Sequence, residues 1–181
     1  MTDWPTTPGG SLLNGTIHSL GLASMIGDWA MVRRAASATS TAWTTANDAV
    51  YIPFIVEVPV TAFQMGIENG ATLGGNVDVG IYDINGVRLV SSGSVAQAGV
   101  STIQTFDITD TPLTPGIYYM AFASNSTTAT FIGTSGGAAE WWRTYGVQDQ
   151  ATAFALPATA TFSSMGRAQL PNIVIATKAT L

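Results

Sequence analysis

Few residues in this chain could perform acid–base, nucleophilic or metal chemistry. The sequence has no cysteine and a single histidine, His18. No Asp, Glu or second His lies near His18 at the spacing of a metal site or proton relay, and a serine triad would have to depend on this one imidazole. We therefore interpret His18 as a structural or solvent-facing residue. The chain is expected to have no catalytic residue, cofactor or metal site, and so not to be an enzyme.

Carboxylates are the next candidates, because two of them meeting across a sheet is the arrangement that glycosidases use. The run Asp83-Ile84-Asn85-Gly86 is instead typical of a hairpin turn, and residues 107–110 are typical of a strand end. Asp83 and Asn85 also fit the start of a calcium loop, but the later ligands are missing. The four candidate aspartates lie within or beside strands, and we favour this structural interpretation over an acid–base pair: they are Asp78, Asp83, Asp107 and Asp110.

Residues 140–145 form the densest aromatic cluster, Glu-Trp-Trp-Arg-Thr-Tyr. Flat aromatic faces stack on sugar rings, with charged neighbours as polar contacts. Adjacent residues of a strand point to opposite faces, so a shared aromatic platform requires a loop, and we expect a loop here. Aromatic residues and Arg also concentrate at protein interfaces, and this core or interface interpretation is favoured over a sugar contact. The candidate ligand or interface residues are Trp141, Trp142, Arg143 and Tyr145.

Charge is scarce throughout the chain. Charged residues are 9% of the 181 residues, the net charge is −5, and Lys178 is the only lysine. Soluble domains carry about 25% charged residues, so much of this surface is expected to be covered by partners. No basic patch suits nucleic acid. No apolar run suits a membrane span and no leader-like N-terminus is present, so neither a membrane nor a secretory location is expected.

Period-two patterns and turn signals predict the elements that position these residues. Val77, Val79 and Ile81 alternate with less apolar residues, and Asn85-Gly86 predicts a type I′ hairpin turn. Further strands are expected at 102–108 and 117–123, the latter covered on both faces.

Alternation is also clear from Val50 to Val60, and its phase changes before Phe63, which predicts a turn or bulge. Pro53 and Pro59 cannot donate ladder hydrogen bonds, so this stretch is expected at a sheet edge or a corner. With shorter strands near 129–132 and 172–177, the chain has about eight to ten strands and no long helix. The fold class is all-β, a two-sheet antiparallel β-sandwich, jelly-roll-like, with an extended N-terminal arm.

Two regions follow from these patterns. Residues 1–47 lack a sustained period and form an N-terminal arm or attachment segment, which either lies across a neighbour or packs on the chain's own sandwich. Residues 48–181 form the β-sandwich domain.

Four short stretches resemble a jelly-roll module of bacteriophage virion proteins. Similar modules occur in secreted carbohydrate-binding proteins, and the resemblance spans residues 48–177. The stretches are YIP at 51–53, GNVDVGIYD at 75–83 followed by Gly86, LTPGIYYMA at 113–121, and LPNI at 170–173.

This resemblance implies a non-enzymatic structural protein of a phage virion, assembled in the host cytoplasm. It would decorate or cement the capsid or form part of a head or tail fibre. We expect a homo-oligomer, a trimer being favoured, in contact with a major capsid or tail protein. The alternative is a receptor-recognition module that binds a glycan through residues 141–145.

Overall fold

Antiparallel strands make up nearly all regular structure in the computed structural model, which describes residues 17–18, 23–26, 29–32, 39–135 and 137–179. The larger sheet of this part of the chain has eight strands. Six lie in the order β14 (Ser163–Ser164), β13 (Gln148–Gln150), β5 (Asp48–Val56), β11 (Gly116–Ser124), β7 (Asn76–Asp83) and β8 (Arg88–Ser91). Outside this path, β1 (Ile17–His18) pairs with β5 and β9 (Val95–Ala96) with β7.

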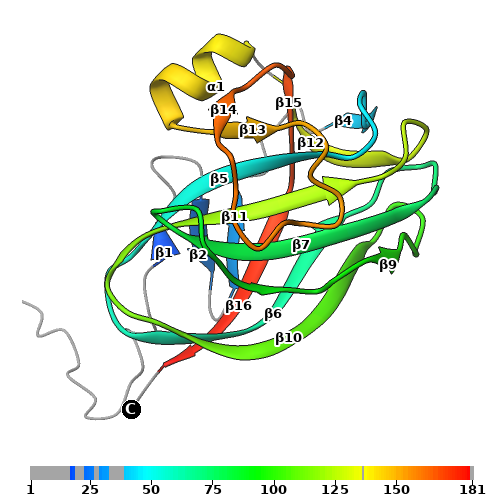
Figure 1. Ribbon diagram of the computed structural model, residues 1–181. Coiled ribbons are helices and arrows are strands. Elements are labelled where there is room, and N and C mark those ends of the chain that lie inside the picture. Colours follow the sequence, from blue (N-terminus) through cyan, green and yellow to red (C-terminus); the bar gives the residue numbers. More distant parts are fainter. Residues whose placement is uncertain (1–16, 19–22, 27–28, 33–38, 136, 180–181) are drawn as a thin grey trace, which may run out of the picture.

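Two smaller sheets form the facing layer (Figure 1). One has the order β10 (Ile103–Leu113), β6 (Val60–Glu68), β16 (Ile173–Ala179), β3 (Trp29–Val32) and β2 (Ala23–Ile26). The other has the order β15 (Gln169–Pro171), β12 (Thr130–Ser135) and β4 (Thr39–Ala42). The β15–β16 segment joins them, because β15 pairs with β12 and β16 pairs with β6.

The connections between layers follow the jelly-roll pattern. Strands β4, β6, β10 and β12 lie in one layer, whereas β5, β7, β8 and β11 lie in the other. The order β5-β11-β7-β8 faces β4-β12 and β6-β10, with the β15–β16 segment inserted between them. The predicted all-β sandwich of jelly-roll type is therefore confirmed.

Strand β5 explains how one sheet is buried on both sides. Its even-numbered residues Val50, Ile52 and Phe54 enter the main core between the layers. Its odd-numbered residues Ala49 and Tyr51 enter a second apolar cluster on the outer face. That outer face is covered by the segment 151–162, which contributes side chains such as Leu156 to the cluster. In β11 the two-sided burial expected for residues 117–123 holds from Met120 onward.

The prolines of the β5–β6 region occupy two different places. Pro59 lies in the connection between β5 and β6, which cross from one layer to the other, as expected for a corner. Pro53 lies inside the sheet rather than at an edge, paired with Tyr119 of β11. On its other side, among the described residues, β13 pairs only with residues 49–51 and β1 only with residues 55–56, so no described strand there requires an N–H from Pro53.

The β7–β8 hairpin is present, but the prediction of a type I′ turn is wrong. Gly86 has φ +79°, whereas Asn85 is not among the residues with positive φ. The Gly86 amide donates to the Asp83 carbonyl (3.0 Å), and Asp83 Oδ1 accepts from the amides of Asn85 (2.9 Å) and Val87 (2.8 Å). Because the Asp83 carboxylate satisfies these amides, only glycine needs the left-handed conformation, as in a three-residue loop.

The expected loop over residues 140–145 is also wrong, because the segment is helix α1 (Ala138–Tyr145). The helical residues contain no Gly or Pro. Gly146 ends the helix with φ +68°, and its backbone amide donates a hydrogen bond to the Trp142 carbonyl (3.1 Å). Among the described residues, no helix is long and apolar enough to cross a membrane.

The described part of the predicted N-terminal arm pairs with the sandwich of the same chain. Strand β1 pairs with β5, β3 with β16, and β4 with β12. Residues 1–16, 19–22, 27–28 and 33–38 lie outside the described residues. The attachment role of this segment stays a prediction.

Truncation of one aromatic side chain in the main core should strongly lower the free energy of unfolding. Phe122 is fully buried between Trp43 and Phe131. Phe122→Ala should lower the free energy of unfolding by about 3–5 kcal/mol, because it removes buried surface and leaves a cavity. Urea denaturation measures this. The control Leu89→Ala alters a side chain that is 40% exposed and should change stability by less than about 0.5 kcal/mol. Equal effects of the two substitutions would contradict this description of the core.

Candidate functional site

The predicted aromatic site lies on α1, but its described side chains do not form one platform. Trp142 is 38% exposed, and the guanidinium carbon of the exposed Arg143 lies 5.8 Å from its ring centroid. Tyr145 is half-buried and packs against the main core. Trp141 belongs to the same helix, and its side chain lies outside what the structure describes. Of the four predicted residues, only Trp142 and Arg143 therefore have exposed side chains among those that the structure describes.

The four aspartates considered for acid–base chemistry do not meet. Asp83 holds the β7–β8 turn, which confirms its interpretation as a turn residue. Asp107 accepts a hydrogen bond from Gln64 Nε2 (2.7 Å), and Asp110 pairs with Lys178 (2.5 Å) at the surface. No group of three or more His, Cys, Asp or Glu that could hold a metal ion occurs within the described ranges.

Asp78 is fully buried and anchors the segment that covers the outer face of the larger sheet. Its Oδ1 accepts from Ser92 Oγ (3.2 Å) and its Oδ2 from the Leu156 amide (3.0 Å). Arg88 Nη1 donates to the Leu156 carbonyl on the same segment. Burial raises the pKa of Asp78, and the hydrogen bonds from Leu156 and Ser92 oppose that shift.

A serine motif that the sequence analysis passed over lies at the end of β12. Residues 133–137, Gly-Thr-Ser-Gly-Gly, match the G-x-S-x-G pattern of a nucleophile elbow, followed by α1. Ser135 is nevertheless a strand residue paired with Gln169 and lacks the positive φ of a strained elbow. Gly133 has a packing role, since a side chain there would collide with the Leu170 carbonyl. This motif therefore does not form an elbow.

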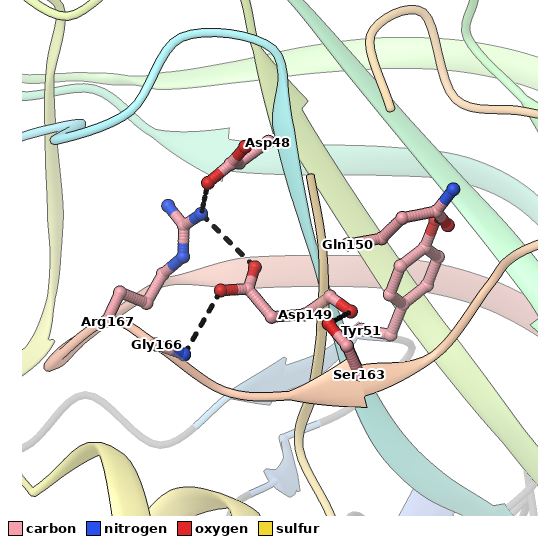
Figure 2. A network of polar contacts seen from close by, with 7 residues as sticks. All are labelled: Asp48, Tyr51, Asp149, Gln150, Ser163, Gly166 and Arg167. Carbon is pink, nitrogen blue, oxygen red and sulfur yellow. Dashed lines mark hydrogen bonds and ion pairs between the residues drawn. The ribbon is translucent and has the colours of Figure 1, made fainter. Parts of the chain in front are cut away.

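The most concentrated polar group is a cluster that sequence reasoning missed, shown in Figure 2. Arg167 Nη2 lies 3.0 Å from Asp48 Oδ2 and 3.1 Å from Asp149 Oδ1. The side chains of Arg167, Asp48 and Asp149 are only 5%, 15% and 11% exposed. The Gly166 amide also donates to Asp149 Oδ2 (3.3 Å). The cluster joins β5, β13 and the segment before β15.

Arg167 also stacks on the indole of Trp43, with its guanidinium carbon 3.8 Å from the ring centroid. Trp43 is 1% exposed, so this is a buried cation–π contact. Three nitrogen atoms of the pair have no hydrogen-bond partner among the described residues: Arg167 Nε, Arg167 Nη1 and Trp43 Nε1. An unsatisfied buried donor costs about 1–3 kcal/mol, so these groups call for a physical explanation.

A pocket of about 140 Å³ opens beside this stack. It adjoins the buried charged cluster, and Arg167 and Trp43 both contribute to its wall. The residues that line it are Thr41, Trp43, Thr44, Arg167, Ala168 and Gln169.

Burial dominates the electrostatics of the cluster. It raises the pKa of Asp48, and neighbouring Asp149 raises it further. Arg167 lowers the same pKa, but its effect is smaller than that of burial. Two carboxylates share one guanidinium, so with all three groups ionised the cluster carries one net negative charge.

Comparison with known proteins gives no relative to guide the interpretation. No family model matches the chain, and no curated protein matches its sequence.

Removing the guanidinium should be strongly destabilising. Arg167→Met leaves two buried carboxylates without their cation, and we expect a loss of about 3–5 kcal/mol in the free energy of unfolding. In the background Asp48→Asn/Asp149→Asn, the same substitution should cost much less, because no buried charge is left uncompensated. Urea denaturation of the four proteins measures this difference. The same cost in both backgrounds would contradict the charge-pairing role of Arg167.

The raised pKa of Asp48 predicts a specific pH dependence. The folded state binds this proton more tightly than the unfolded chain, whose ordinary value is 3.8. The stabilising contribution is therefore complete below that pH and is lost as pH rises through the folded pKa. The free energy of unfolding of wild type, minus that of Asp48→Asn, should therefore fall as pH rises from roughly 3 to 7. Urea unfolding across that range tests it, and a difference that grows with pH would refute the assignment.

Proposed function

We propose that this chain is a non-enzymatic structural protein of a bacteriophage virion. It decorates or cements the capsid, or forms part of a head or tail fibre, as a symmetric homo-oligomer in contact with other virion proteins. The jelly-roll strand order is compatible with this role, although the fold alone does not decide function.

The position of the resembling stretches supports the proposal. YIP lies on β5, GNVDVGIYD extends along β7, and LTPGIYYMA includes the first half of β11. These three strands are adjacent in the larger sheet. Three of the four stretches therefore lie on adjacent strands, whereas LPNI lies at β15 and β16 of the facing layer.

A patch of exposed aliphatic side chains at one end of the sandwich is the observation that carries the assembly role. This tip patch consists of Ile84, Val87 and Ile117, which are 51%, 46% and 42% exposed. Tyr118 of β11 pairs with Asp83 of β7, so the next residues, Ile117 and Ile84, lie side by side at the end of the sheet. In a chain with only 9% charged residues, burial of this patch against a second copy gives a favourable hydrophobic contribution.

The free edge of β10 is a poorer contact surface. Its register shifts between Asp107 and Thr111, and Pro112 lies within the strand. Together with the exposed carboxylates Asp107 and Asp110, these features are those by which proteins prevent edge-to-edge strand addition. These features favour self-association through the tip patch over extension of the sheet at β10.

The oligomeric state tests this proposal. Light scattering of the full chain should show a multimer, with a trimer expected, and Ile84→Asp/Ile117→Asp should convert it to a monomer with little change in melting temperature. The matched control is Val100→Asp, because Val100 is 54% exposed but precedes β10 at the opposite end of the sandwich. A wild-type monomer, or a multimer that survives the double substitution, would refute assembly through the tip patch.

A second candidate function is glycan recognition on α1. The observation that favours it is the exposure of Trp142 beside Arg143, since an exposed indole with a neighbouring cation can stack on a sugar ring. Tyr145 packs against the core, so this surface offers one aromatic face rather than the broader platform that the sequence suggested.

A further inference from the structure

The segment 151–162 lies over the outer face of the larger sheet as a strap, drawn in orange in Figure 1. Only Ala153 and Leu156 of these residues are buried, and half of the segment is exposed. Elements with few buried contacts open locally at a lower free energy than the strands beneath them. The strap can therefore open as a unit while the sandwich stays folded.

The centre of the strap is anchored on a buried carboxyl group. The Leu156 amide donates to Asp78 Oδ2 (3.0 Å), and Arg88 Nη1 donates to the Leu156 carbonyl. The Leu156 side chain packs over Gly80, where an added Cβ would lie 3.1 Å from Leu156 Cδ1. Asp78 is fully buried in this arrangement. Opening the strap would therefore expose the Asp78 carboxyl to water.

The strap begins at a strained residue. Thr152 has φ +56°, a left-handed conformation that a β-branched residue rarely adopts. Such strain persists only where the surrounding contacts hold the backbone in place. Here the Thr152 amide donates to the Asp48 carboxylate, and the Ala153 amide donates to the Asn47 carbonyl (2.5 Å). Release of this strain favours opening.

Ser92 is placed to accommodate a proton on Asp78. Ser92 Oγ lies 3.2 Å from Asp78 Oδ1 and 3.0 Å from the Gly93 carbonyl oxygen, and it accepts from the Val79 amide (3.1 Å). One hydroxyl proton cannot serve both oxygens fully. When Asp78 Oδ1 carries a proton, it can donate to Ser92 Oγ, and the Ser92 proton is then free for the Gly93 carbonyl. The closed strap therefore suits a neutral Asp78.

The electrostatics have the same direction. Burial raises the pKa of Asp78 from its ordinary value of 3.8, and the hydrogen bonds from Leu156 and Ser92 oppose that shift without cancelling it. Once the strap is open, the solvated carboxyl returns to its ordinary value. The closed form therefore binds the proton more tightly, so closure is most favourable below that value and weakens as pH rises through the pKa of the closed form.

The other ionisable groups that face Asp78 in the described chain are Arg88 of β8 and Tyr82 of β7. Arg88 lowers the pKa of Asp78, and its guanidinium stays charged throughout. Burial raises the pKa of Tyr82, so its phenol stays neutral. The strap itself contains no charged residue. Asp78 is therefore the group in this contact whose charge changes between acidic and neutral pH.

We propose that residues 151–162 form a proton-linked strap, which stays closed over the outer face of the larger sheet while Asp78 is neutral and opens more readily once Asp78 is ionised. Opening uncovers the apolar face formed by Ala49, Tyr51, Ala121 and Ala123 and leaves the main core in place. The proposal rests only on the contacts of the strap, so it holds whether or not the chain assembles into a virion.

Hydrogen exchange of the full-length protein, followed by nuclear magnetic resonance, measures the opening. The reporter is the Ala160 amide, which donates to the Gly86 carbonyl (2.7 Å), and the reference is the Phe122 amide in the centre of the larger sheet. Exchange rates divided by those of an unstructured chain at the same pH give each opening equilibrium. Ala160 should open more than Phe122.

The opening equilibrium of the strap should also rise with pH. Between roughly pH 4 and 7, it should increase by up to about tenfold for each unit by which closure raises the Asp78 pKa. The exchange of the Ala160 amide reports this rise, because Ala160 lies in the strap but makes no hydrogen bond to Asp78.

Variants assign the proton. Asp78→Asn removes the titration, so the opening at Ala160 should become independent of pH. If that variant does not fold, Ser92→Ala replaces it. Loss of the Ser92 hydrogen bond should raise the Asp78 pKa further and extend the rise to higher pH. The matched controls are Asp48→Asn, at the start of the strap, and Asp107→Asn, on the facing layer, and both should keep the rise.

Three results would overturn the proposal. The first is equal opening at Ala160 and Phe122, which would show that the strap opens only when the whole chain unfolds. The second is an opening equilibrium at Ala160 that stays constant or falls as pH rises. The third is a rise that persists in Asp78→Asn, or one that Ser92→Ala leaves unchanged, which would assign the proton to another group.

Discussion

The packing of the two layers against each other depends on the buried side chain of Trp43. Its ring meets Phe122 of β11 edge-on at 4.9 Å and Phe131 of β12 at 6.3 Å, so it connects the larger sheet with the facing layer. Arg167 covers the same ring at 3.8 Å. One residue in a short connection before β5 therefore joins both layers and the C-terminal segment, because a large aromatic side chain contacts several elements at once.

Two-sided burial of the larger sheet has consequences for the polar groups around it. Small residues such as Ala121 and Ala123 on its outer face let the segment 151–162 approach closely. The segment is held by polar contacts, with Tyr82 donating to the Pro157 carbonyl (2.6 Å) and the Leu156 amide donating to Asp78. Burial of Asp78 is tolerated because both carboxylate oxygens accept hydrogen bonds.

The described ion pairs of this charge-poor chain differ in their burial. Lys178 and Asp110 pair at the surface, where such a contact contributes little to stability. Arg167 is instead buried with two carboxylates and leaves part of its guanidinium unsatisfied beside a pocket. Charge pairing and stacking on Trp43 therefore meet in one residue.

The sequence by itself determined the fold class and most strands, because the alternation of apolar and less apolar residues in β5 and β7 is a local signal. It did not predict α1, whose eight residues are too short for a clear helical period. Only the tertiary structure decided the turn type at Asn85, the place of Pro53 and the polar cluster. Asp48 and Arg167 are 119 residues apart, and no local pattern encodes their contact, because it arises from the return of the C-terminal segment past β5.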